Sequence, residues 1–359
     1  LDVRSPGEYT HAHIPGAHNL PLFSDEERKE VGTRYKQISR EAAIKIGLDY
    51  FGVKMRKMVE AVEQLTGNSQ LARESWQPLE GKAHDKNGVL VHCWRGGMRS
   101  AAVAWLLELY GFNVYLLVGG YKAYRKWVLA QFEHAYSFRI IGGYTGSGKT
   151  LLLRELGKQG NQIIDLEALA SHKGSAFGAL GEMPQPKQEM FENMLANALF
   201  ATRCPLGGEQ QLNTSNDQQA GAIFIEDESQ RIGNLQIPMA LWYTMRKSPV
   251  YFVDIPFEER LDYITRDYGK HEKEKLVNAV IRIQKRLGGL DTRNAINFLV
   301  ENNFKECFRI LLNYYDKWYG KALLNRENIA TLLNKIPCDS VDTVVNTNKL
   351  LSCFTVSPV

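Results

Sequence analysis

The sequence has few cysteines and no pair of them in a C-x2-C arrangement. The five cysteines are scattered along the chain, at Cys93, Cys204, Cys307, Cys338 and Cys353. This scatter argues against a disulfide framework and against a structural zinc site, and it favours a reducing compartment. No apolar run approaches the length of a membrane span, and no signal peptide is recognisable. We therefore expect a cytoplasmic protein with no membrane partner.

A methionine is missing from position 1. The chain opens on Leu1–Arg4, which has the pattern of a strand, so we expect the natural N-terminus to be missing. The 359 residues are enough for two or three domains, and 44% hydrophobic with 23% charged residues is an ordinary composition for a globular protein.

The net charge of +4 is small, but the positive charge is concentrated near the C-terminus. Between Lys270 and Arg326 there are twelve Lys and Arg residues and six Asp and Glu residues. A basic helical region of this kind is a candidate nucleic-acid surface. A solvated helix face explains the same charges equally well.

One turn of the chain concentrates chemically reactive groups. His92–Ser100 reads HCWRGGMRS and follows the strand-like run Gly88–Val91, while Ala101–Tyr110 has helical spacing. A strand-to-helix turn directs backbone N–H groups and the positive end of the helix dipole into one concavity, and Arg95 and Arg99 add full charges. We therefore expect a lowered pKa and a nucleophilic thiolate at Cys93. The competing interpretation is a small buried hydrophobic side chain.

The motifs around this turn resemble the rhodanese domain. They are, in order, Asp2-Val3-Arg4, His13–Ala17 (HIPGA), the Cys93 turn and Leu116–Ala123 (LLVGGYKA). The resemblance implies an α/β domain with a central parallel sheet over residues 1–133, and a chalcogen atom carried on Cys93. The C-x5-R loop is one residue longer than in ordinary sulfur-carrying rhodaneses and looks like that of dual-specificity phosphatases. A wider loop fits a bulkier group, such as phosphate or a selenium-containing one.

The segment between these motifs has helical patterns. Asp25–Arg28 begins a polar helix, Val31–Gln37 is expected to break it, and Ser39–Ala43 and Met55–Leu65 predict two further helices.

A second domain begins with a phosphate-binding motif. The short strand Phe138–Gly142 precedes a G-x4-G-K-T sequence and an apolar helix, the context in which this motif is specific. The predicted phosphate-binding residues are Gly143, Thr145, Gly146, Ser147, Gly148, Lys149 and Thr150. The glycines let N–H groups wrap a phosphate, Lys149 reaches its outer oxygens, and the Thr150 hydroxyl can ligate Mg²⁺. We expect a P-loop NTPase-like α/β domain over 137–268 and a helical C-terminal region over 269–359.

Acidic residues follow the next predicted strands of this sheet. Asp165 ends one strand, and Glu226 and Asp227 follow another, at the edge where ligands bind. We predict that Thr150, Asp165 and one of Glu226 and Asp227 hold Mg²⁺; the sequence leaves open which one.

Aromatic residues are frequent in the basic C-terminal region. Tyr314, Tyr315, Trp318 and Tyr319 lie within one short stretch. They suit stacking on unpaired RNA bases, but at helical spacing they also suit a core.

The combination of the two domains resembles the tRNA 2-selenouridine synthase family. The matching segments are Val31–Gln37, Cys93–Ser100, Gly143–Thr150, Asp165–Ala170 with His172–Ser175, and Ile225–Ser229. The resemblance implies replacement of sulfur by selenium at C2 of wobble 2-thiouridine in tRNA, with selenophosphate as donor. It also implies an S-geranyl-2-thiouridine intermediate made from geranyl diphosphate.

Under this hypothesis Cys93 holds or relays selenium and Arg95 and Arg99 steady the anion. Lys149, Thr150 and the loop amides bind diphosphate or selenophosphate, with Mg²⁺. Two alternatives remain: a Cys-dependent phosphatase or sulfurtransferase fused to a nucleotide-binding, kinase-like domain, and a non-catalytic tRNA-binding module.

Overall fold

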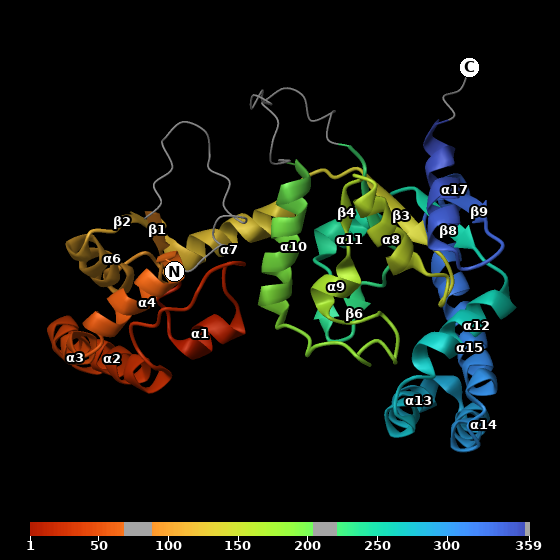
Figure 1. Ribbon diagram of the computed structural model, residues 1–359, viewed down its shortest axis with the longest axis horizontal. Helices are drawn as coiled ribbons and strands as arrows, with labels where there is room; N and C mark the ends of the chain where they lie inside the picture. The colour runs from red at the N-terminus through yellow and green to blue at the C-terminus, as the bar shows by residue number, and fades with distance from the viewer. Residues whose placement is uncertain (68–87, 204–220, 356–359) are drawn as a thin grey trace. The chain divides into compact units, whose positions relative to one another are not determined.

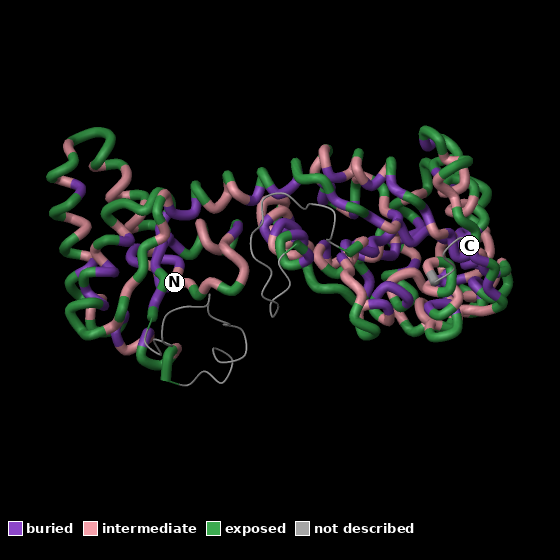
Figure 2. The backbone as a smooth tube through the Cα atoms, turned by 90° about the horizontal axis from the view of Figure 1, so that it is seen from above, coloured by how far each residue is buried: buried purple, intermediate pink, exposed green. Residues whose placement is uncertain are grey.

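The structure is a computed structural model, and it describes residues 1–67, 88–203 and 221–355. The chain divides into two compact units. Unit 1 comprises Leu1–Gln131 with Glu192–Asn197, and unit 2 comprises Phe132–Phe191 with Ala198–Val359. Along several helices, buried and exposed residues alternate, as expected for helices with one face on a core (Figure 2).

Unit 1 is built on parallel strand pairing. Strand β1 (Gly88–Val91) pairs with β2 (Asn113–Leu116), and isolated bridges join Asp2 to Asn19 and to His92. The described helices of this unit are α1 (Pro6–His11), α2 (Asp25–Gln37), α3 (Arg40–Gly52), α4 (Met55–Gly67), α6 (Met98–Tyr110) and α7 (Gly120–Gln131). The core side chains come from the N-terminal segment before α2 and from α3, α4, β1 and α6, and the core includes Cys93 itself. The predicted α/β domain with a parallel sheet is confirmed.

The predicted break at Val31–Gln37 is wrong, because α2 runs without interruption to Gln37. Ser24 and Glu27 form a capping box at its start, and Glu30 accepts from Arg34 at 3.0 Å one turn along. Each such contact stabilises the helix by a fraction of a kcal/mol, and together they offset the ~1 kcal/mol that Gly32 costs in the middle of α2.

Unit 2 contains a five-stranded, wholly parallel sheet in the order β4-β5-β3-β8-β9. The strands are β3 (Phe138–Gly142), β4 (Ile163–Ile164), β5 (Ile223–Glu226), β8 (Val250–Asp254) and β9 (Leu333–Pro337). Strands β3, β5 and β8 consist largely of buried apolar residues, as expected for a sheet covered on both faces. The predicted P-loop-like α/β fold is confirmed. The edge strand β9 was not predicted, because LNKIP lacks a continuous apolar run.

The remaining elements from β3 onward are α8 (Lys149–Lys158), α9 (Leu166–Ala170), α10 (Gln188–Arg203), β6 (Arg231–Ile232), β7 (Leu235–Gln236), α11 (Met239–Arg246), α12 (Phe257–Tyr268), α13 (Lys273–Leu287), α14 (Gly289–Val300), α15 (Phe304–Leu324), α16 (Ile329–Leu332) and α17 (Thr343–Thr355). The middle of α10, Glu192–Asn197, belongs to unit 1. Helices α12 to α15 gather into one group (Figure 1) and share an apolar core. Within the described ranges, no helix is long and apolar enough to cross a membrane.

Candidate active site

The Cys93 turn joins β1 to α6, as the sequence predicted. The Cys93 sulfur accepts a hydrogen bond from the Gly97 N–H at 3.3 Å and lies 3.2 Å from the Ser100 hydroxyl oxygen. Cys93 is only 3% exposed, whereas Trp94 and Met98 on the same turn are exposed. The thiol therefore lies inside a ring of backbone donors whose rim faces solvent.

The surroundings lower the pKa of the Cys93 thiol. Burial raises this pKa, but hydrogen bonds from the Ser100 side chain and from the backbone N–H groups of Ser100, Arg95 and Gly97 stabilise the thiolate and outweigh burial. Cys307 shows the contrast, because burial without such donors raises its pKa to about 12. The turn thus has the chemistry of a nucleophile.

A second loop supports the Cys93 turn through its backbone. Tyr121 N–H donates to the Cys93 carbonyl and Lys122 N–H donates to the Trp94 carbonyl, both at 2.9 Å. A Cβ atom on Gly120 would lie 2.3 Å from the Cys93 carbonyl oxygen, and Gly120 has φ of +59°. Only glycine allows this approach, which explains the Gly-Gly pair of the LLVGGYKA motif.

The Asp2-Val3-Arg4 motif forms a buried support for the same region. Arg4 donates to both carboxylate oxygens of Asp2 and to the Ala12 carbonyl, and its guanidinium lies 3.8 Å from the centre of the Tyr121 ring. The pair is almost fully buried, so removing either partner would leave an uncompensated charge.

The two arginines of the turn are placed differently. Arg99 donates to Glu8 at 2.7 Å and forms an ion pair with it, while Arg95 is exposed. The Arg99–Glu8 pair holds the guanidinium at α1. An anion-binding role for Arg95 and Arg99 therefore stays a prediction.

The P-loop of unit 2 connects β3 to α8. Gly143, Gly146 and Gly148 have φ values of +155°, +83° and +71°. A Cβ atom on Gly146 would lie 2.8 Å from an Ile264 side-chain carbon and 3.0 Å from the Arg260 carbonyl oxygen. The loop therefore needs glycine both for its backbone conformation and for its packing.

The side chains of this loop are arranged around its backbone. The Lys149 ammonium donates to the Gly143 carbonyl at 2.9 Å, so it lies across the mouth of the loop. The Ser147 hydroxyl is buried and has no hydrogen-bond partner among the described residues. The Thr150 hydroxyl donates to Glu167 at 2.7 Å. Glu167 was not predicted as a site residue; its position two residues after Asp165, at the start of α9, was the available signal.

Carboxylates gather beside Thr150. Glu226 is fully buried, one of its oxygens accepts from the Glu167 N–H at 3.3 Å, and the other has no partner among the described residues. Burial first, and then the charges of Glu167 and Asp165, raise the pKa of Glu226 to about 8. Burial also raises the pKa of Glu167 and, strongly, that of Glu228. Such a cluster is stabilised by a cation or by protons.

The other two predicted metal ligands make structural contacts. Asp165 caps α9 by accepting from the Ala168 N–H at 2.7 Å and accepts from Arg154 at 2.8 Å. Asp227 accepts from the Tyr319 hydroxyl at 2.6 Å and pairs with the buried Arg326. Of Glu226 and Asp227, Glu226 is thus the one beside Thr150.

Across the described residues, no group of three or more His, Cys, Asp or Glu side chains has an arrangement ready to hold a metal. The Mg²⁺ site stays a prediction, and Thr150, Glu167 and Glu226 are the side chains that best fit it.

Helix α15 holds the P-loop from a distant part of the sequence. The Tyr319 hydroxyl accepts from the Gly143 N–H at 3.1 Å, and Asp316 makes a two-pronged pair with Arg260 at 3.0 and 2.7 Å. Arg260 in turn donates to the Thr145 carbonyl at 3.0 Å. Tyr314 and Tyr315 pack against the helical core, so core packing accounts for two of the four clustered aromatic residues. Tyr319 contacts the P-loop, and Trp318 is 49% exposed.

Comparisons with known proteins identify a family for each half of the chain. A family model for the tRNA 2-selenouridine synthase AAA domain matches residues 136–336, and a model for the rhodanese-like domain matches residues 1–126. A tRNA 2-selenouridine synthase from Marinobacter nauticus is 32% identical over 361 residues, which is 91% of this chain and 89% of the relative. The chain belongs to the tRNA 2-selenouridine synthase family. The resemblance predicted from the sequence is confirmed.

Two further members of the tRNA 2-selenouridine synthase family align over a shorter part. The protein from Bdellovibrio bacteriovorus is 39% identical over 273 residues, 75% of this chain and 64% of the relative. The protein from Nitrosomonas europaea is 36% identical over 272 residues, 75% of this chain and 63% of the relative. In these alignments the chain spans less than two thirds of the relative's length.

The lowered pKa of Cys93 can be measured by alkylation. The rate of Cys93 modification by iodoacetamide, followed by peptide mass spectrometry, should rise with pH through a midpoint below that of N-acetylcysteine. Restricted access of the reagent to the buried sulfur slows the reaction by the same factor at every pH, so it does not move the midpoint. Ser100→Ala should raise the midpoint, because it removes a hydrogen bond to the thiolate. An equal midpoint in the two proteins would show that Ser100 does not tune the thiol.

The raised pKa of Glu226 predicts a pH dependence of stability. Unfolding lowers the pKa from about 8 to its ordinary value of 4.5, so the folded state holds a proton that the unfolded state loses. The free energy of unfolding should therefore fall as pH rises from about 4.5 to about 8. Glu226→Gln should flatten this slope, with a gain at pH 8 on the order of 2 kcal/mol in urea denaturation. The exposed Glu259→Gln serves as control, and an equal slope in all three proteins would contradict the assignment.

Proposed function

We propose that the protein replaces sulfur by selenium at C2 of 2-thiouridine at the wobble position of tRNA. Selenophosphate supplies selenium, and the reaction passes through an S-geranyl-2-thiouridine made from geranyl diphosphate. The observation that carries this proposal is the pairing, in one chain of this family, of a thiol with lowered pKa and an intact phosphate-binding loop.

The order of the two steps follows from leaving-group chemistry. Sulfur at C2 of thiouridine leaves poorly, whereas an alkylated sulfur leaves as a thiol. The thiouridine sulfur first attacks the geranyl carbon and diphosphate departs. The selenium of selenophosphate then attacks C2 and displaces geranyl thiol, and water cleaves the Se–P bond to release phosphate. The first step needs a site that holds a departing diphosphate, and the second needs a site that delivers selenium.

Unit 2 fits the diphosphate step. Lys149 and the loop N–H groups are donors for phosphate oxygens, and preorganised donors stabilise charge that develops on a leaving group. Thr150, Glu167 and Glu226 offer the hard oxygen ligands that Mg²⁺ prefers, and the unpartnered Glu226 oxygen supports that fit. When bound, Mg²⁺ would neutralise part of the diphosphate charge.

Unit 1 fits the selenium step. Cys93 is the group proposed to hold or relay selenium, because its thiolate is stabilised by the turn. The phosphatase alternative needs the arginine of the C-x5-R loop to grip a phosphate beside the thiol. The Arg99–Glu8 ion pair disfavours that alternative.

The first test separates the two steps through Cys93. Thiolated tRNA, geranyl diphosphate and selenophosphate are incubated with the enzyme, and nucleosides are measured by mass spectrometry. Cys93→Ala should abolish 2-selenouridine while S-geranyl-2-thiouridine still forms, and the control Cys353→Ala should behave as wild type. Normal selenation by Cys93→Ala would remove the relay role.

The second test concerns Lys149. Lys149→Ala should slow geranylation by roughly 10²-fold, because one preorganised donor to the departing diphosphate is lost. Lys158→Ala, on the exposed end of the same helix, is the matched control. Unchanged incorporation of radiolabelled geranyl in Lys149→Ala would show that the P-loop serves another ligand.

A further inference from the structure

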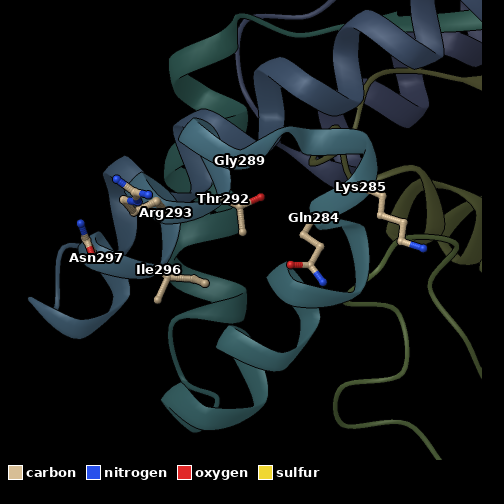
Figure 3. Close-up of a pocket in the computed structure, with 7 residues that line it drawn as sticks. All are labelled: Gln284, Lys285, Gly289, Thr292, Arg293, Ile296 and Asn297. Carbon is tan, nitrogen blue, oxygen red and sulfur yellow. The ribbon is translucent and has the colours of Figure 1, made fainter.

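A pocket of about 510 Å³ lies where α13 meets α14, in the basic part of unit 2. Figure 3 shows the lining side chains, which come from the last turn of α13 and one side of α14. They include the cations Lys285 and Arg293, the amides Gln284 and Asn297, and the apolar Ile296. No Asp or Glu lines the pocket. Its walls therefore offer many hydrogen-bond donors and no negative charge.

The fold leaves this surface open. Gly288 has φ of +95° and makes the sharp turn between the two helices. Leu287, Ala295 and Leu299 on the other side of the helix pair are buried in the core of the helical group. Thr292 is buried and Ile296 packs partly against the same core, while the lining residues Lys285 and Arg293 are exposed. Core packing therefore does not require the cations of this pocket.

The positive charge at this pocket is uncompensated. Three exposed cations nearby have carboxylate partners: Lys305 lies 2.6 Å from Asp262, Lys275 lies 3.2 Å from Glu272, and Lys270 lies 3.5 Å from Asp267. Within the described part of the chain, the exposed Lys285, Arg286 and Arg293 have no carboxylate within 4.0 Å, and Lys273 and Arg282 of α13 add two further exposed cations without one. Like charges placed together without counter-charges raise the free energy of the folded protein, and an anionic ligand lowers it.

We infer that this pocket binds the sugar–phosphate backbone of the tRNA substrate, an inference that rests on the proposed function. Lys285 and Arg293 match phosphate oxygens, Gln284 and Asn297 can bond ribose hydroxyls, and Ile296 can contact the apolar face of a ribose. The pocket lacks exposed aromatic side chains for stacking bases. It therefore positions the RNA without reading its sequence.

The test compares two double variants that lose the same net charge. Lys285→Ala/Arg293→Ala removes the unpaired cations, whereas Lys270→Ala/Lys275→Ala removes two exposed cations that already have carboxylate partners. Binding of an unmodified tRNA transcript is measured by filter binding over a range of KCl concentrations. Circular dichroism confirms that both variants fold.

The pocket variant should bind tRNA about tenfold or more weakly at low salt, and its slope of log K against log[salt] should be shallower by about 1 to 2. The control should stay within about threefold of wild type. In the selenation assay the pocket variant should raise the apparent KM for tRNA and leave kcat unchanged. Equal losses in the two variants would overturn the inference.

The outcomes also separate this inference from the proposed function. If wild type makes 2-selenouridine and both variants bind tRNA equally well, the inference fails and the function stands. If wild type binds tRNA but makes no product, the function fails, and the comparison of the variants still decides the pocket. If wild type binds no RNA and its pocket instead binds an acidic protein, both the pocket inference and the proposed function fail.

Discussion

Both candidate sites depend on hydrogen bonds from backbone N–H groups at a turn between a parallel strand and a helix. In unit 1 these donors surround a sulfur, and in unit 2 they line a loop that lysine and threonine complete. Because the donors belong to the main chain, their directions are fixed by φ and ψ rather than by side-chain rotamers. Both turns contain glycines with positive φ, because the required N–H directions need backbone conformations that other residues rarely adopt.

The P-loop is also held by groups that follow it by more than a hundred residues. Arg260, Asp316 and Tyr319 form hydrogen bonds that end on the Thr145 carbonyl and the Gly143 N–H. Arg260 is 3% exposed, so these bonds are shielded from water and restrict the loop more than surface contacts would. Helix α15 is therefore part of the structure of the phosphate site, although it belongs to the helical C-terminal region.

Local sequence patterns made part of both candidate sites predictable. Strand, turn and helix are consecutive in both sites, over residues 88–110 around Cys93 and over residues 138–158 around the P-loop, so the three elements could be recognised together. The hydrogen bonds of Thr150 with Glu167 and of Gly143 with Tyr319 could not be predicted from the sequence, because each joins elements that meet only in the folded protein. The choice between Glu226 and Asp227 was open for the same reason: neighbours on a strand point to opposite faces, and the chain does not reveal which face holds Thr150.

In unit 1, the close backbone contact between Gly96 and the loop before α7 fixes the shape of the Cys93 turn, whereas exposed side chains on the same turn are free to set its ligand specificity. A Cβ atom on Gly96 would lie 2.9 Å from the Leu117 carbonyl oxygen, so the cradle tolerates no added methyl group there. Trp94, Arg95 and Met98 project from the rim of the same cradle and are exposed. Substitutions at these three positions can therefore change which ligand the turn accepts, while the backbone around Cys93 keeps its conformation.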